Sequence, residues 1–165
     1  MGMNTSMTRL YGRAIGGERA IDKILSKNKG NTSVIGAMRL TGIVSTMRIE
    51  GSVDGSAFNS FIESFLLPQL KPGDVVLMDN AKVHLSKKAE KLILAVKARI
   101  IFLPPYSPDL APIEKLWSKV KQYLRSVKAR TKRKLYNAFT KACDTVSLSN
   151  IKGWFSNSGY RPSRT

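Results

Sequence analysis

The chain has 165 residues and a formal net charge of +17, from 28 Lys and Arg against 11 Asp and Glu. Its hydrophobic fraction of 42% excludes a disordered chain, and no apolar stretch approaches the roughly 20 residues that span a bilayer. The single cysteine, Cys143, cannot form an internal disulfide and favours a reducing, cytoplasmic compartment. We therefore expect one domain over residues 1–160, a frayed basic tail at 161–165, and an anionic partner.

In chain order, the residue patterns predict an α/β fold. Residues 1–18 are polar and glycine-rich and are expected to be loop. Residues 32–40 and 43–49 flank a Thr41-Gly42 turn and predict an antiparallel hairpin, with Ile43 and Met47 on one face of its second strand. The elements expected beyond the hairpin are helix 54–67, strand 75–78, helix 86–96, strand 99–103, helix 113–127, helix 132–146 and helix 148–157. The two short strands are almost wholly apolar, which is typical of burial on both faces.

Two carboxylates, Asp79 and Glu114, are the strongest candidates for chemistry. Asp79 follows the apolar strand 75–78, and the ends of such strands often carry binding groups. Glu114 opens a predicted helix, and thirty-four residues lie between the two. Together they could hold a magnesium ion, which prefers a few carboxylates plus water and phosphate oxygens. Each also has a purely structural interpretation: Asp79 as a turn cap, and Glu114 as a favourable charge at a helix start.

The other candidates are weaker individually. His84 is the only histidine, and either a structural role or proton transfer would fit it. Residues 115–141 hold ten Lys or Arg and no Asp or Glu, which indicates a surface for nucleic acid, with an anionic membrane as the rival. The residues that we expect to contact DNA are Lys115, Lys119, Lys121, Arg125, Lys128, Arg130, Lys132, Arg133 and Lys134.

Longer motifs in the chain resemble a known family. Met78-Asp79-Asn80 with His84, followed by a proline-rich segment over residues 102–114 that ends in Pro112-Ile113-Glu114, resembles the DDE transposases of bacterial insertion sequences, in the mariner-superfamily branch. The resemblance extends from about residue 3 to residue 160. Shorter motifs that also fit are Tyr11-Gly12-Arg13, Gly17-Glu18-Arg19, Leu66-Leu67-Pro68 and Pro72-Gly73-Asp74.

This resemblance implies a ribonuclease-H-like mixed sheet flanked by helices. It also implies an Asp-Asp-Glu triad that holds two Mg²⁺ (or Mn²⁺) ions, one activating a water or DNA 3′-hydroxyl and the other stabilising the leaving oxygen. Asp79 matches the second acid and Glu114 the third, with Asn80 and His84 as auxiliary residues. The implied partners are transposon-end and target DNA, and the implied setting is the cytoplasm, in association with the nucleoid.

Two departures from the family pattern stand out. Ala111 replaces the usual Asn before Pro112-Ile113-Glu114. More seriously, no residue matches the first aspartate, which in the family lies on the first strand, just before the segment equivalent to residues 2–4. Asp22 follows a glycine-rich loop and Asp54 starts a helix, so neither replaces it. We therefore expect a catalytic-domain fragment that lacks its first strand, lacks the usual helix-turn-helix region, and binds the metal weakly.

Three functions remain open. The first is a transposase fragment for DNA cleavage and strand transfer, inactive unless the missing part is supplied. The second is a non-catalytic DNA-binding protein, or a partner of full-length transposase or of a second copy. The third is a ribonuclease-H-like nuclease with another substrate. The missing strand itself fits a decayed remnant, a split or frameshifted element, or a late assigned start.

Overall fold

The computed structural model describes residues 1–23 and 30–160, so the predicted tail at 161–165 lies outside the described residues. The strands are β1 (Gly2–Met3), β2 (Thr32–Arg39), β3 (Gly42–Glu50), β4 (Val75–Met78) and β5 (Arg99–Phe102). The helices are α1 (Gly55–Phe61), α2 (Lys87–Ala95), α3 (Pro112–Val127), α4 (Lys132–Asp144) and α5 (Leu148–Asn157). The α/β prediction is confirmed from residue 32 onward. Before it, the loop expected over residues 1–18 contains the short strand β1.

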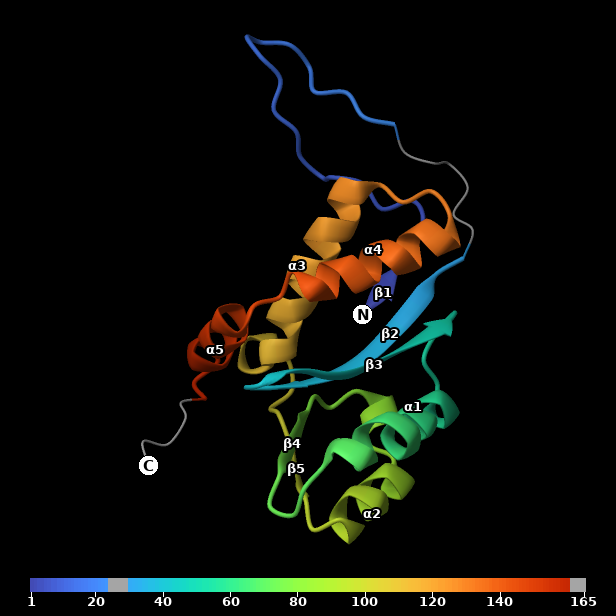
Figure 1. Cartoon of the computed structure of the whole chain (residues 1–165), viewed down its shortest axis with the longest axis vertical. Helices are drawn as coiled ribbons and strands as arrows, with labels where there is room; N and C mark the ends of the chain where they lie inside the picture. The colour runs from blue at the N-terminus through green and yellow to red at the C-terminus, as the bar shows by residue number, and fades with distance from the viewer. Residues whose placement is uncertain (24–29, 161–165) are drawn as a thin grey trace.

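The β2–β3 hairpin lies between two layers (Figure 1), with α3 and α4 over one face and α1, α2, β4 and β5 on the other. β2 pairs antiparallel with both β1 and β3. Along β2 the side chains alternate, so Val34 packs towards α3 and α4 while Ile35 packs towards α1.

A bulge changes the faces of β3. Ala37 pairs with Ser45 but Met38 pairs with Ile43, which leaves one extra residue in β3. Ile43 therefore packs in the core under α3, whereas Met47 packs in the other core. The prediction that these two residues share a face is wrong, because a bulge interrupts the alternation on which it depended.

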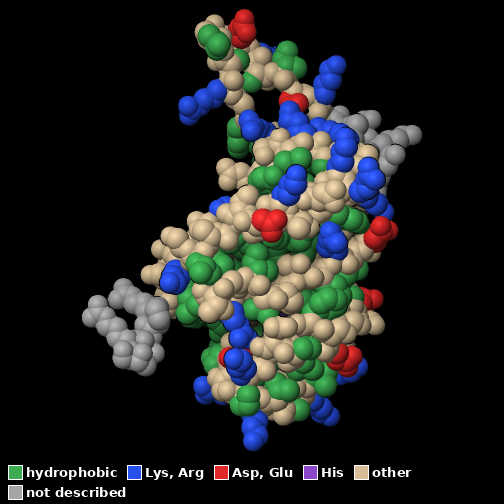
Figure 2. Space-filling view, in the orientation of Figure 1, with side chains coloured by type: hydrophobic (Ala, Val, Ile, Leu, Met, Phe, Trp, Pro, Cys, Tyr) green, Lys and Arg blue, Asp and Glu red, His purple; other side chains and the backbone are tan. Residues whose placement is uncertain are grey.

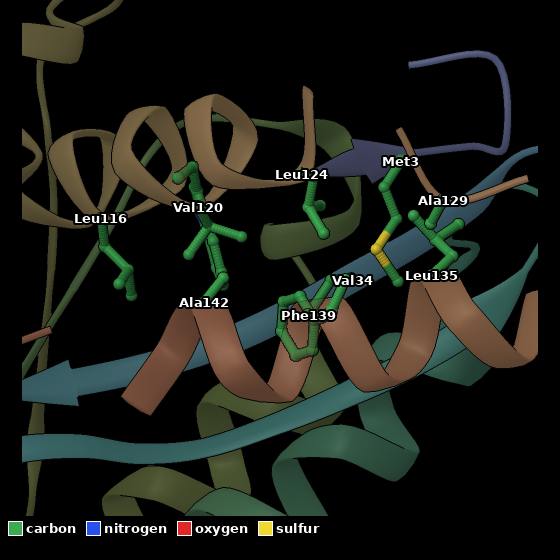
Figure 3. Close-up of a cluster of buried hydrophobic side chains, with 11 residues drawn as sticks. Met3, Val34, Leu116, Val120, Leu124, Ala129, Leu135, Phe139 and Ala142 are labelled. Carbon is green, nitrogen blue, oxygen red and sulfur yellow. The ribbon is translucent and has the colours of Figure 1, made fainter. Parts of the chain in front are cut away.

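The core on the α3 side joins helices to strands. Figure 3 shows its buried side chains converging from α3, α4, β1 and β2. The apolar stripe predicted for α3 is confirmed, since Leu116, Trp117, Val120 and Leu124 are all buried. Burial of each such large side chain contributes about 1.5–3 kcal/mol. The partners of this stripe are Met3, Val34, Ala129, Leu135, Ala138, Phe139 and Ala142.

The second core lies under α1 and α2 and includes Phe58, Ile62, Met78 and Ile93. Asp54 caps α1 as predicted, with its side chain accepting a hydrogen bond from the Ala57 N–H at 2.8 Å. After α1 the chain widens into a π-helical turn over Ile62–Leu66 and then tightens into a 3₁₀ turn over Leu67–Gln69. The helix predicted over 54–67 is thus a composite.

Strands β4 and β5 pair in parallel, from Val75 with Arg99 to Met78 with Phe102. The predicted burial on both faces is wrong, since Val75 is 42% exposed and Ile101 51% exposed. These two strands form a separate two-stranded sheet among the described residues, so side chains at its rim retain contact with solvent. Among the residues that the structure describes, no helix is long and apolar enough to cross a membrane.

Residues 9–23 form an extended arm, which projects beyond the end of α3 (Figure 1). The base of the arm is fixed from the loop between α3 and α4. Arg130 donates to the carbonyl oxygens of Thr5 and Met7 at 3.1 and 3.2 Å, and Lys128 lies 2.6 Å from the carboxylate of Asp22. The same carboxylate accepts a hydrogen bond from the Thr8 hydroxyl at 2.8 Å.

Candidate active site

Asp79 immediately follows β4, and the ends of β4 and β5 are joined around it. The Leu103 N–H donates to the Met78 carbonyl at 2.8 Å. The Asn80 side-chain amide donates back to the Leu103 carbonyl at 2.5 Å. Asn80, predicted as an auxiliary residue, therefore holds together the two strand ends from which Asp79 emerges.

Two contacts orient the carboxylate of Asp79, and both involve the same oxygen. Oδ1 accepts from the Ala81 N–H at 3.1 Å and lies 2.6 Å from Nδ1 of His84. The contact with the Ala81 N–H is the turn cap that was the structural interpretation of Asp79. Because both contacts involve Oδ1, Oδ2 remains available to a ligand, and the side chain is 61% exposed.

His84 is positioned by its own neighbours. It ends a 3₁₀ turn over Lys82–His84, and its ring packs against Phe58 with centroids 4.8 Å apart. Nδ1 also lies 3.3 Å from the backbone carbonyl of Asp79. The ring therefore connects α1 to the carboxylate of Asp79.

Glu114 lies in the first turn of α3, after Pro112, and its side chain is exposed. Three residues later, Trp117 is buried against β2, which fixes how α3 sits on the sheet. Among the described residues, the carboxylate of Glu114 has no hydrogen bond or ion pair. It can therefore accept a ligand without first losing a partner.

The loop before α3 is held by residues that the sequence analysis did not single out. The Ser158 hydroxyl donates to the carbonyl of Asp109 at 2.6 Å, and the Tyr160 hydroxyl donates to the carbonyl of Leu110 at 2.9 Å. Both donors follow α5, about 50 residues further along the chain. Asp109 itself lies in a 3₁₀ turn over Pro108–Leu110. No local pattern reveals such long-range contacts.

The amino group of Met1 lies within the electrostatic influence of both Asp79 and Glu114. Burial lowers the pKa of this group below its usual 8.0, while the charges of Glu114 and Asp79 raise it and that of Lys121 lowers it. Met1 is aligned by Val34, which accepts from the Met1 ammonium at 2.8 Å and donates to the Met1 carbonyl at 2.7 Å. The start of β1 and the two carboxylates therefore lie close enough to interact electrostatically.

The donor set fits part of a divalent-metal site. Two exposed carboxylates, with room for water and phosphate oxygens, suit Mg²⁺ or Mn²⁺. In the described part of the chain, no three His, Cys, Asp or Glu side chains gather as a metal site. As expected, Asp22 and Asp54 do not complete it, because they are engaged at the arm base and the start of α1.

Lys and Arg side chains gather where α3 ends and α4 begins (Figure 2). The basic residues predicted to contact DNA fall into two groups, those that have a partner within the chain and those that have none. Lys119 donates to the carbonyl of Thr145 and to the side chain of Asn150. Lys128 and Arg130 hold the base of the arm. Lys132 lies 2.6 Å from the carboxylate of Glu50. Within the described residues, the side chains without a hydrogen bond or ion pair are those of Lys115, Lys121, Arg125, Arg133 and Lys134.

The first turn of α4 carries Lys132, Arg133 and Lys134 and no acidic residue. Cations at this end of a helix oppose the helix dipole, which favours an anion there.

Comparisons with known proteins identify the family of the chain. A family model described as "DDE superfamily endonuclease" matches residues 1–136. The "Transposable element Tcb2 transposase" of Caenorhabditis briggsae and the "Transposable element Tc1 transposase" of Caenorhabditis elegans are each 25% identical over 126 residues, 74% of this chain and 46% of the relative. The chain thus spans about half the length of the curated relatives it matches.

Solved structures show the fold. The Mos1 strand transfer complex matches with a TM-score of 0.76 at 12% identity, over 96% of this chain and 50% of that chain. The Mos1 transposase catalytic domain with raltegravir and Mg matches with a TM-score of 0.63 at 14% identity, over 78% of this chain and 72% of that chain. The ribonuclease-H-like fold implied by the sequence motifs is confirmed.

Proposed function

Because the chain belongs to the DDE superfamily endonuclease family, whose model covers residues 1–136, we propose that it is part of a transposase catalytic domain. The proposed reaction is metal-dependent cleavage of DNA and transfer of the cut strand, with Asp79 and Glu114 as the metal ligands. One observation carries the assignment: Asp79 and Glu114 are both exposed carboxylates with an oxygen free for a ligand, and both lie in the segment that the family model matches.

In this reaction, a bound Mg²⁺ or Mn²⁺ would activate the attacking water or 3′-hydroxyl and stabilise the leaving oxygen. Asp79 would bind through Oδ2, since Oδ1 is occupied by Ala81 and His84. Glu114 would supply the second ligand from α3. Lys115 and Lys121 follow it on the same helix and would hold the phosphates of the DNA strand. The solved Mos1 structures include complexes with Mg, with Mn and with a left transposon end, which supports this choice of metal and partner.

A third acid would complete the site, and we propose that it belongs to a strand leading into Gly2–Met3. β1 is only two residues long, and its start lies near both carboxylates. Without the third acid, two carboxylates bind a metal weakly, and we expect the chain by itself to be inactive.

The test is to supply the third acid. The N-terminal portion of a related transposase is added, in cis or in trans, and strand transfer is measured with Mg²⁺. Asp79→Ala or Glu114→Ala should abolish the restored activity, because each removes a metal ligand. Asp109→Ala is the matched control and should retain activity. Restored activity that survives loss of Asp79 or Glu114 would refute the site.

The second candidate is a non-catalytic DNA-binding protein, or a partner that pairs with full-length transposase or with another copy of itself. It is favoured by the net charge of +17 and by the basic first turn of α4. Metal dependence separates the two candidates, since DNA binding of this kind should survive replacement of Asp79 and Glu114 by Ala.

We infer a bacterial insertion sequence as the source, from the proline-rich motif over residues 102–114, and a nucleoid-associated place in the cytoplasm. The curated relatives named above come from nematodes, so this finer assignment depends on the motif alone. Transposon-end DNA and target DNA are the proposed partners.

A further inference from the structure

A cavity of about 640 Å³ lies between the arm and α3, away from the two carboxylates. Arg9 and Tyr11 line it from the arm, and Lys119, Tyr123 and Arg125 line it from α3. None of the described residues that line it is acidic. The cavity is therefore bounded by three cations and two aromatic rings, one ring on each wall.

No carboxylate in the described part of the chain neutralises the positive charge around the cavity. Among the described residues, Arg9 and Arg125 have no carboxylate partner. Lys119 donates at 2.9 Å to the carbonyl of Thr145 and at 2.5 Å to the Asn150 side chain, which are both uncharged acceptors. Its position is thus fixed while its charge remains. Converging cations that lack counterions favour a phosphate-bearing ligand.

The two tyrosines favour a ligand that also has a flat ring. Tyr11 is 89% exposed, so its ring gains little from packing within the chain. Tyr123 is half-buried in α3 and presents a fixed surface opposite it. Stacking of bases on aromatic side chains is the usual way in which proteins hold unpaired nucleotides, and it tolerates any base.

One residue of the cavity wall, Arg125, lies on the face of α3 that carries Glu114. Glu114, Lys121 and Arg125 share one face of α3, because separations of seven and eleven residues are close to whole helical turns. At 1.5 Å per residue, Arg125 lies roughly 16 Å along the helix from Glu114. Arg125 therefore connects the cavity to the face of α3 that carries Glu114 and Lys121.

We propose that this cavity binds an unpaired nucleotide of the DNA strand. Arg9, Lys119 and Arg125 hold its phosphates, and its base stacks between Tyr11 and Tyr123. The inference goes beyond the metal site and rests on the proposed function only in taking DNA as the substrate. It makes the arm a substrate-binding element.

The experiment compares three probes on the intact chain: a single-stranded oligonucleotide, the same oligonucleotide with abasic sites throughout, and a duplex of equal length. Affinity is measured by fluorescence anisotropy at one fixed salt concentration. The wild-type chain should bind the normal strand more tightly than the abasic strand. Tyr11→Ala should weaken binding of the normal strand roughly fivefold to a hundredfold and leave the abasic strand unchanged.

Ile15→Ala is the matched control, since Ile15 is an equally exposed apolar residue of the arm that does not line the cavity. It should change neither affinity. Arg125→Gln should weaken both single strands, because it acts on phosphates.

Equal binding of normal and abasic strands would overturn the inference and leave the proposed function standing. An absence of binding to all three probes would overturn both. If Tyr11→Ala changed only self-association and not DNA affinity, the arm would be a protein contact and the inference would again fail.

Discussion

Trp117 lies directly against Gly36, with no space between them for a side chain. A Cβ at Gly36 would come within 2.8 Å of Trp117 Cη2 and 3.3 Å of the Ser45 carbonyl oxygen. Trp117 is buried and follows Glu114 by three residues on α3. The contact therefore sets how closely the helix that carries a proposed metal ligand approaches the sheet.

Gly36→Ala should displace Trp117 and destabilise the fold by about 1–3 kcal/mol, the usual cost of overpacking a core. Chemical denaturation measures the free energy of unfolding. Gly153→Ala is the matched control, because nothing lies within 4 Å of a Cβ there and the residue is in α5. It should stabilise by about 0.5–1 kcal/mol. Equal effects at the two positions would contradict the packing described for Trp117.

His84→Ala should loosen the Asp79 carboxylate, which it contacts at 2.6 Å. Removing a residue that orients a metal ligand commonly lowers metal affinity about 10- to 100-fold. Mn²⁺ affinity, measured by electron paramagnetic resonance, should fall accordingly. Lys82→Ala, in the same 3₁₀ turn, should have little effect. Tighter binding after loss of His84 would mean that the ring competes with the metal instead of positioning its ligand.

Much of the fold could be predicted, because it depends on local patterns. Apolar periodicity located α3, and the cap at Asp54 located the start of α1. The predictions failed where the pairing of a strand with another strand decides which side chains are buried. The face of Ile43 depends on a bulge in the pairing with β2, and the exposure of Ile101 depends on how many strands lie beside β5.

The residues of the candidate site could likewise be predicted only in part. Asp79 and Glu114 stand in motifs that can be recognised from the sequence. The supports of the site could not be recognised, since Tyr160 contacts Leu110 across 50 residues and no local pattern links them. The proximity of Met1 to both carboxylates likewise appears only when the elements are packed together.

Acid should loosen the base of the arm. Hydrogen bonds from Lys128 and then Thr8 lower the pKa of the Asp22 carboxyl from 3.8 to about 2. Because the folded value lies below the unfolded one, the pairing stabilises the arm base above about pH 3.8 and is lost as the pH falls through about 2. NMR titration should give a midpoint near 2 for the Thr8 amide, absent in Asp22→Asn. A midpoint near 3.8 would show that the pairing does not form.

Charge reversal of Lys132, Arg133 and Lys134 should lower DNA affinity and flatten its dependence on salt. The slope should fall by about 0.9 for each DNA phosphate that the variant no longer neutralises. Binding isotherms across a salt series measure it. Reversal of Lys87, Lys88 and Lys91 on α2 is the matched control, because that set also contains one lysine already paired, with Glu63. If both triple variants alter the slope equally, the DNA surface is not at α4.

The most direct test of the central claim is paramagnetic broadening of the backbone amide signals of this chain by Mn²⁺, which detects even weak binding. We expect broadening centred on Asp79, Asn80 and Glu114, and its loss in both Asp79→Asn and Glu114→Gln. Broadening that is centred elsewhere, or that persists in these two variants, would contradict the assignment of Asp79 and Glu114 as a shared metal site.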